Sequence, residues 1–417
     1  MKNENLNKNI LSGLKAFLNA FLNKMKLIRK HKLSLLEIFI LLLLVVFVSF
    51  FAGYIYNDKK AVFKDKQLSD KNIEKFIENY NYVIDNYYKD INKEELIDGA
   101  IAGMMESLGD PYSVYLDSDT SNNMNITLNG SYKGIGVAVS NSEDNYIKVV
   151  AILKDSPASK ADIKEGDIIK KINNINTHNM SISDFSDLVL SNKDNDYELE
   201  ILRDGEEIKK VVEKQKVVID SVSSKIIEKN NKKIGYIYIS VFASNTDKQF
   251  MKSLNELETS KIDALIIDVR NNTGGHLNSV EKILKQFLTK QQIVYQMKKD
   301  NEITKTYGSA KANKDYEIVV VGNHYSASAS EILISGLKEN LKSKYIGEKS
   351  YGKGTVQEIV TLSNNKQYKI TTKKWLTPKG NFVGDTSGII PDIEIELENN
   401  DTDLQLDRAL DYLLQAN

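Results

Sequence analysis

The feature that most constrains the fold is an alternation of apolar strands and helices in the C-terminal half of the chain. Strand patterns cover 233–242, 263–270 and 317–322, and helical patterns cover 246–258, 278–288 and 328–340. The strand segments are almost continuously apolar, which is typical of strands that are covered on both faces. The alternation therefore predicts an α/β core with buried strands.

The last of these helices begins with three serines that alternate with alanine. Ser326, Ser328 and Ser330 follow the apolar strand that ends at Gly322. A side chain at a helix N-terminus meets a partial positive charge, which favours an alkoxide or an oxyanion. Serine and alanine are also common where helices start and pack tightly, so this stretch alone does not establish a nucleophile.

A serine nucleophile needs a base, and the sequence offers two kinds. Lys353 stands between two glycines in "YGKGTVQ", with Gln357 four residues later, and His324 stands four residues before Ser328. Either a histidine or a lysine held in its neutral form can activate a hydroxyl group. A surface turn would also explain the glycines around Lys353.

The N-terminal part contains a candidate membrane span. The segment from Ile38 to Tyr56 has 19 residues and no charge. At about 1.5 Å per residue a helix of this length extends roughly 28 Å, which is close to the thickness of the bilayer's hydrocarbon core. No A-x-A-like cleavage site follows, so we expect residues 33–56 to form a transmembrane helix that stays attached as an anchor.

Charge on either side of this span predicts its orientation. Residues 1–32 carry eight Lys or Arg and one acidic residue, whereas four lysines follow the span before residue 70. The denser positive charge predicts that the basic tail is cytoplasmic and that the rest of the chain lies on the extracytoplasmic side of the cell membrane. Within this tail, "ILSGLKAFLNAFL" fits an interfacial amphipathic helix or a disordered segment.

Composition excludes several classes of site. The chain has 56 basic and 57 acidic residues, so its overall charge does not suggest a nucleic-acid partner. It has no cysteine, which excludes disulfides, a thiol nucleophile and thiolate metal ligands. The four histidines are widely separated and form no HExxH-like pair, so we expect neither a metal site nor a cofactor.

Residues 57–129 form a predicted helical segment. Apolar residues recur at helical spacing in "KNIEKFIENYNYVIDNYY", and Asn92 with Glu95 reads as a capping box for a second helix. The stretch "GDPYS" at 109–113 predicts the turn that ends this second helix.

Residues 130–214 change to short strands separated by turns. The strand patterns cover 132–140, 146–153, 166–173 and 196–212. A helical pattern at 182–190 lies between the last two strands. This order, together with "SPASKADIKEGDIIKKIN", resembles a PDZ domain. The resemblance implies that Gly134, Ile135, Gly136 and Val137 form a loop that binds the C-terminal carboxylate of a peptide. A small β domain without a ligand is the alternative.

Several blocks together resemble the C-terminal processing (tail-specific) peptidases, which are Ser-Lys proteases with an inserted PDZ domain. The two main blocks are "NHYSASASE" and "YGKGTVQ"; the others, in chain order, are "GDPYS", "IGYIYISVF", "IDVRNNTGG", "TPKGNFV" and "GIIPDI". The resemblance covers roughly residues 68–395. It implies a ClpP/crotonase-like α/β protease core at 215–417, including a C-terminal extension.

The family pattern assigns roles to five residues. It places the nucleophile 25 residues before the lysine, which selects Ser328 and makes Lys353 the general base. Lys353 has to be neutral to accept a proton, so burial must lower its pKa. The resemblance further implies that Gln357 holds the lysine by a hydrogen bond. The backbone amides of Gly274 and Ala329 would form the oxyanion hole.

Two residues depart from the family pattern. Thr273 stands where proline is common, and His276 replaces a residue that is typically apolar. A Ser-His pair that uses His324 stays open as an alternative base arrangement.

The resemblance implies a membrane-anchored endopeptidase that cleaves proteins with free C-termini near those termini and that forms homodimers. A membrane-anchored PDZ adaptor without catalysis is the main alternative. A hydrolase of small acyl substrates would explain neither the PDZ domain nor the anchor.

Overall fold

The computed structural model describes residues 71–191, 195–362, 366–384, 388–396 and 402–415. The predicted basic tail (1–32) and membrane helix (33–56) lie outside these residues. Among the described helices, none is long and apolar enough to cross a membrane. The chain divides between Leu96 and Ile97 into two units.

The two predicted N-terminal helices are present as α3 (Lys71–Asn86) and α4 (Lys93–Glu106). No residue of α3 is buried. The start of α4 is held by Asn92, whose Oδ1 accepts the N–H of Glu94 and whose amide donates to Oε1 of Glu95 at 2.8 Å. Asn92 thus caps this helix as the sequence predicts.

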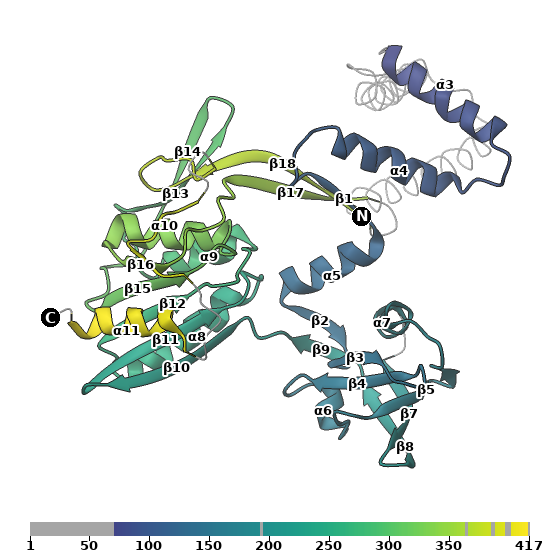
Figure 1. The fold of residues 1–417 in the computed structure, drawn as a ribbon, viewed down its shortest axis with the longest axis horizontal. Helices are drawn as coiled ribbons and strands as arrows, with labels where there is room; N and C mark the ends of the chain where they lie inside the picture. The colour runs from purple at the N-terminus through teal and green to yellow at the C-terminus, as the bar shows by residue number, and fades with distance from the viewer. Residues whose placement is uncertain (1–70, 192–194, 363–365, 385–387, 397–401, 416–417) are drawn as a thin grey trace, which may run out of the picture. The chain divides into compact units, whose positions relative to one another are not determined.

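A six-stranded sheet forms the centre of the larger unit (Figure 1). In spatial order its strands are β10 (Val222–Lys229), β11 (Lys232–Ile239), β12 (Ala264–Asp268), β15 (Glu317–Gly322), β16 (Lys344–Gly347) and β19 (Ile393–Glu394). The pair β10–β11 is antiparallel and all other neighbours are parallel. The predicted α/β core is therefore confirmed.

Helices cover both faces of this sheet, as the alternation of side chains along β12 requires. Leu265 and Ile267 pack in one apolar cluster with α8 (Thr246–Thr259), α9 (Leu277–Leu284) and α10 (Ala329–Leu341). Ala264 and Ile266 pack in another cluster with α11 (Leu404–Gln415), drawn in yellow in Figure 1. Because both faces are covered at the centre of the sheet, β12 and β15 are buried and almost wholly apolar.

A second sheet brings distant segments of the chain together. It is built around β18 (Gln367–Leu376), which pairs with β1 (Val114–Leu116), β13 (Ile293–Lys299) and β17 (Thr355–Thr361); β14 (Glu302–Tyr307) pairs with β13. The pairing of β1 with β18 sets Val114 opposite Lys369. The "GDPYS" turn, which directly precedes β1, is thereby fixed beside the strand pair that follows Lys353.

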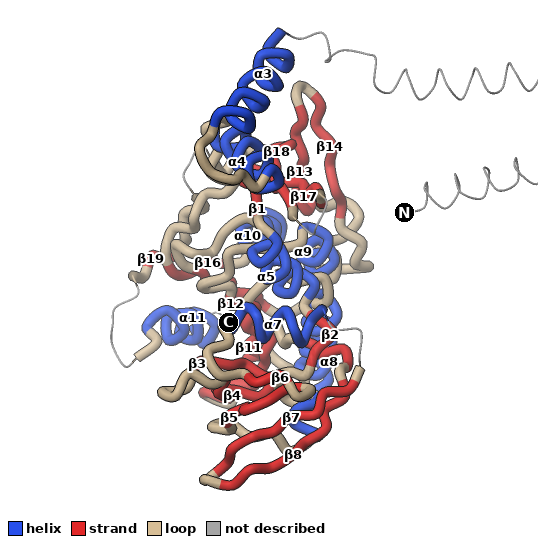
Figure 2. Tube along the Cα trace, turned by 90° about the vertical axis from the view of Figure 1, so that its right-hand side faces the viewer, coloured by secondary structure: helices blue, strands red, loops and turns tan. Residues whose placement is uncertain are grey.

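The region that resembles a PDZ domain forms its own sheet and core (Figure 2). Its strands are β3 (Val137–Asn141), β4 (Ile147–Ile152), β5 (Ile168–Ile172), β6 (Ile175–Asn176), β7 (Asp196–Arg203) and β8 (Glu206–Glu213). Its helices are α6 (Pro157–Lys160) and α7 (Ile182–Ser191). The pair β2 (Ser131–Gly134) and β9 (Gln215–Val218) and the helix α5 (Ser118–Asn129) lead into and out of it.

Candidate active site

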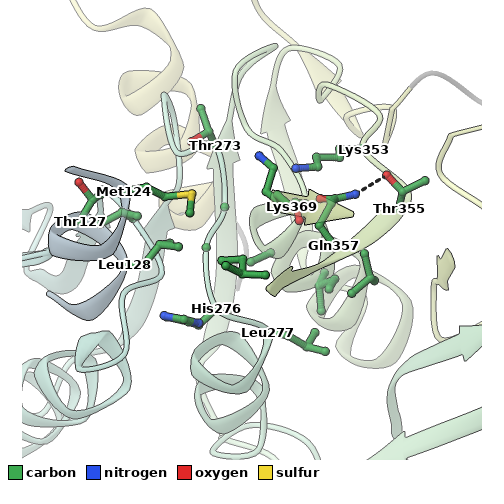
Figure 3. A pocket seen from close by; sticks show the side chains of 18 of the residues that line it. Met124, Thr127, Leu128, Thr273, His276, Leu277, Lys353, Thr355, Gln357 and Lys369 are labelled. Atoms are coloured by element: carbon green, nitrogen blue, oxygen red, sulfur yellow. Dashed lines mark hydrogen bonds between the residues drawn. The ribbon is translucent and has the colours of Figure 1, made fainter. Parts of the chain in front are cut away.

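A pocket of about 730 Å³ contains all five residues that the sequence assigns to catalysis (Figure 3). Met124 and Leu128 of α5, and Leu277 and Ile332, give it an apolar side. The five predicted residues that line it are Gly274, Ser328, Ala329, Lys353 and Gln357. The five predicted residues, which lie up to 83 positions apart in the sequence from Gly274 to Gln357, thus meet in one cavity that is large enough for a peptide side chain and backbone.

The three serines have different environments. Ser326 is fully buried and its hydroxyl donates to the carbonyl of Val269 at 2.8 Å. Ser330 is also fully buried and donates to the carbonyl of Asn272 at 2.8 Å. Ser328 is only partly buried and lines the pocket. Two of the three hydroxyls therefore hold the loop in place, and Ser328 is the one that faces the cavity.

The backbone at Ser328 is strained. Ser328 has φ 56° and ψ −110°, a conformation that a residue with a side chain rarely adopts. It is the last residue of the loop 323–328 that connects β15 to α10. Gly274, with φ 109°, lies so close that an added Cβ would be 3.0 Å from the Ser328 Cβ. Glycine is therefore required at 274.

The predicted oxyanion hole is only partly formed. Ala329 is the first residue of α10, where a backbone N–H has no acceptor within the helix. The N–H of Gly274 instead donates to Oδ1 of Asn272 at 2.9 Å, which differs from the sequence prediction. The reason is local, because an Asn side chain readily accepts a bond from the amide two residues later.

A buried carboxylate, which the sequence analysis missed, organises the site. Oε2 of Glu331 accepts the backbone N–H of Ser328 at 2.7 Å and that of Lys353 at 2.9 Å. Oε1 accepts the Ser350 hydroxyl and the Gly352 N–H, both at 2.7 Å. Burial raises the pKa of Glu331, while these four donors favour its ionised form. Its spacing of three residues after Ser328 was the available sequence signal.

The environment of Lys353 suits a general base. Burial lowers the pKa of Lys353 to about 8, and the positive charge of Lys369 acts in the same direction. The negative charges of Asp110 and Glu331 oppose this shift. Figure 3 shows Lys353 and Lys369 reaching into the same part of the pocket. The neutral amine that proton abstraction requires is thus accessible near neutral pH.

Gln357 does not make the predicted bond to Lys353. Its amide donates to the hydroxyl of Thr355 at 3.0 Å (Figure 3) and also to that of Thr371 at 3.1 Å. The strand register explains the second bond, since Gln357 on β17 lies opposite Thr371 on β18. Gln357 therefore lines the pocket but is held by its own sheet.

His324 and His276 have different environments. His324 does not line the pocket, its side chain is 57% exposed, and its Nδ1 bonds to Glu348. His276 does line the pocket, and its buried Nε2 has no hydrogen-bond partner among the described residues. In the described ranges, no three His, Asp or Glu side chains are grouped so that they could bind a metal ion.

The predicted peptide-binding loop lies at the edge of the PDZ sheet. Gly136 has φ 83°, which breaks the predicted strand 132–140 into β2 and β3. The carbonyls of Ile135 and Gly136 accept bonds from Ala158 and Leu153, which fixes the loop. Among the described strands, β3, which begins at Val137, pairs only with β4, so its other edge is unpaired.

Three segments of the chain match family models. Residues 52–120 match the activating protease CtpB N-terminal domain, residues 148–203 match the PDZ domain, and residues 233–395 match peptidase family S41. These matches follow the order of the N-terminal helices, the PDZ region and the α/β core described above.

Proteins similar to the chain include two from Bacillus subtilis (strain 168). The carboxy-terminal processing protease CtpB is 38% identical over 333 residues, which cover 78% of this chain and 68% of that protein. The carboxy-terminal processing protease CtpA is 30% identical over 368 residues, which cover 87% and 78% respectively. A solved photosystem II D1 C-terminal processing protease is 22% identical with a TM-score of 0.45, covering 77% of this chain and 92% of that one. With this identity over most of both sequences and the matching core, the chain belongs to peptidase family S41 and is a PDZ-containing C-terminal processing serine protease.

Proposed function

We propose that this protein is a membrane-anchored, extracytoplasmic endopeptidase in which Ser328 is the nucleophile and Lys353 the general base. The observation that carries the assignment is the difference among the three serines. Ser326 and Ser330 are buried and bonded to backbone carbonyls, whereas Ser328 lines the pocket that Lys353 also lines. The low pKa of Lys353 supports the role of the lysine.

The reaction follows the acyl-enzyme route. Neutral Lys353 takes the hydroxyl proton of Ser328, and the serine Oγ forms a bond to the carbonyl carbon of the substrate. The tetrahedral intermediate collapses as its C–N bond breaks, and the amine of the product leaves with the proton from Lys353. Water then attacks the ester by the same steps, with Lys353 again the base, and releases Ser328.

Two parts of this proposed site need a local rearrangement. Ala329 can donate to the oxyanion directly from the start of α10, but Gly274 has to release Asn272 first. Gln357 donates to Thr355 and Thr371 from its Nε2 alone, so its Oε1 can accept an N–H of Lys353 once the two side chains turn toward each other. The change at Gly274 exchanges one hydrogen bond for another, so it costs little net free energy.

Substrates are protein chains with free C-termini. We propose that Gly134, Ile135, Gly136 and Val137 receive the terminal carboxylate and that the unpaired edge of β3 pairs with the extended tail. The unpaired strand edge and the left-handed glycine at 136 support this proposal. A homodimer remains part of the proposal on family resemblance alone.

Single substitutions test the dyad. Ser328→Ala and Lys353→Ala should each remove nearly all cleavage of an unfolded reporter protein with a free C-terminus, and the double variant should be no worse. His324→Ala is the control and should cleave normally. Turnover by Lys353→Ala together with loss in His324→Ala would assign the base to the histidine. Binding of the reporter without cleavage by the unmodified protein would favour an adaptor.

Limited digestion tests the membrane topology. In right-side-out membrane vesicles, an added protease should remove the region after Tyr56 and spare residues 1–32. Protection of the C-terminal region would reverse the proposed orientation.

A further inference from the structure

The "GDPYS" turn at 109–113 contains none of the proposed catalytic residues, but it lies beside Lys353. Ser113 is 3% exposed, and its hydroxyl accepts the backbone N–H of Thr371 at 3.0 Å. The next residue, Val114, begins β1 and pairs with Lys369 of β18. The turn is therefore tied to the strand whose lysine shares the pocket with Lys353.

Asp110 makes the turn rigid. Its Oδ1 accepts the N–H of Tyr112 at 3.0 Å, and its Oδ2 accepts the hydroxyl of Ser113 at 2.6 Å. These two bonds close a compact loop around Tyr112. The carboxylate that holds the backbone of this turn also acts on the charge of Lys353.

The ring of Tyr112 contacts the amine of Lys353. Lys353 Nζ lies 4.8 Å from the centroid of the ring, within the distance at which an ammonium group is attracted to an aromatic face. Burial raises the pKa of Tyr112 to about 12, and its hydroxyl interacts with Tyr351. The phenol is therefore neutral at physiological pH, so it cannot itself act as the base.

We propose that this turn is a positioning element for the catalytic base: Tyr112 and Asp110 stabilise the ammonium form that Lys353 adopts after it takes the proton of Ser328. The inference rests on the proposed role of Lys353. Only the proton moves, from Oγ to Nζ, while the ring and the carboxylate stay unchanged. Burial supplies the neutral amine before the reaction, and the turn stabilises its protonated form during the reaction. The turn thus acts on Lys353 as the aspartate of a Ser-His-Asp triad acts on the histidine, by stabilising the protonated base.

The test changes the electron density on the face of the ring and keeps the shape of the ring. Tyr112→Phe retains the aromatic face, whereas a trifluorinated phenylalanine at position 112 has nearly the same size and a weaker negative face. The titration of Lys353 is followed in the Ser328→Ala background by trace acetylation at different pH values and mass spectrometry of the lysine peptide. We expect fluorination to lower the midpoint by about half to one pH unit relative to Tyr112→Phe. Tyr351→Phe is the control, because it removes the same hydroxyl contact. Lys353 should have the same acetylation midpoint in this variant as in Tyr112→Phe.

Activity gives the second measurement. In the protein with Ser328 intact and on the plateau above about pH 9, where Lys353 is neutral in both variants, the trifluorinated variant should show a lower kcat than Tyr112→Phe by about threefold to tenfold, with little change in KM. Equal acetylation midpoints for the two ring variants, or a higher midpoint on fluorination, would overturn the inference. Failure of the proposed function is a separate result, because it would be seen as full activity of Lys353→Ala.

Discussion

Ser328 and Lys353 donate their backbone amides to the same atom, Oε2 of Glu331, at 2.7 and 2.9 Å. The nucleophile and the proposed base come from different loops, and one carboxylate oxygen fixes the distance between their backbones. The second oxygen of Glu331 holds Ser350 and Gly352, which belong to the loop that carries the lysine. The fully buried side chain of Glu331 therefore connects the loop that carries Ser328 to the loop that carries Lys353.

Glu331→Gln should lower both activity and stability. A glutamine has one acceptor oxygen, so its NH₂ group would face two of the four donors and leave them unsatisfied. We expect a loss of about 2–4 kcal/mol in the free energy of unfolding, measured by denaturant titration. Because the loops shift, kcat should fall by about a hundredfold. Glu339→Gln on the same helix is the control, since Glu339 binds one exposed amide of Lys379. Normal kcat in Glu331→Gln would contradict this role.

The pH dependence of kcat/KM should reflect the titration of Lys353. Its pKa is about 8, chiefly because burial disfavours the ammonium form, and only the neutral amine accepts the serine proton. Activity should therefore rise with pH to a plateau, with a midpoint at about 8, and roughly a tenth of the plateau should remain at pH 7. Initial rates on a peptide substrate from pH 5 to 10 measure this curve. A midpoint near 6.5 would point to a histidine instead.

Lys353→Met should make the protein more stable at neutral pH. The pKa of Lys353 falls from 10.5 to about 8 on folding, so between these values the unfolded chain binds more protons than the native one. Wild-type stability therefore rises with pH through this window, and below about pH 8 the buried ammonium lowers stability. We expect Lys353→Met to gain about 1–3 kcal/mol at pH 7, and the difference to shrink as the pH approaches 10.5. A variant that is less stable than wild type at pH 7 would argue against this origin of the shift.

Lys369→Met should move the activity curve to higher pH. The charge of Lys369 is the second cause, after burial, of the low pKa of Lys353, so its removal favours the protonated lysine. Activity at pH 7 should fall by less than about tenfold, with little change on the plateau. Lys373→Met, on the same strand, is the matched control, because Lys373 pairs with the exposed Glu358. Identical curves for the two variants would show that Lys369 has no influence on the base.

Local sequence patterns predicted most of the core. The strands at 233–242, 263–270 and 317–322 and the helices that follow them are present, because continuous apolar runs and helical periodicity are local signals. The family blocks placed Ser328 and Lys353, which share one pocket. The resulting architecture is the ClpP/crotonase-like fold of the family, with its PDZ insertion and N-terminal helical domain.

What the sequence did not predict depends on long-range partners. β1 is three residues long and exists because it pairs with β18, about 250 residues later in the chain. Helix α5 has a polar sequence without clear periodicity, and the side chain of Asp117 and a left-handed Gly130 define its ends. In the structure Gln357 bonds to Thr371 and the Gly274 amide bonds to Asn272, partners that compete with the roles the family pattern assigns to these two residues. Such competition is visible only when the partner segments are placed.

The PDZ loop should recognise a free carboxylate at the end of a substrate. Ile135 is 2% exposed, Gly134 and Gly136 are also buried, and Gly136 adopts φ 83°, so the loop is firmly anchored in its domain. Amides in such a loop can bond to a carboxylate, and the unpaired edge of β3 can extend this pairing along the tail. Amidation of the peptide's C-terminus removes the charge and should cost about 1.5–3 kcal/mol, or roughly tenfold to a hundredfold in Kd.

Calorimetry with free and amidated forms of one apolar-ended peptide, on the Ser328→Ala protein, measures the difference. Gly136→Val, which forces a side chain into a left-handed backbone and toward Ser156, should abolish the discrimination while leaving the core's thermal transition in place. If the Ser328→Ala protein with an unchanged Gly136 binds the free and the amidated peptide with equal affinity, this loop does not recognise the terminal carboxylate.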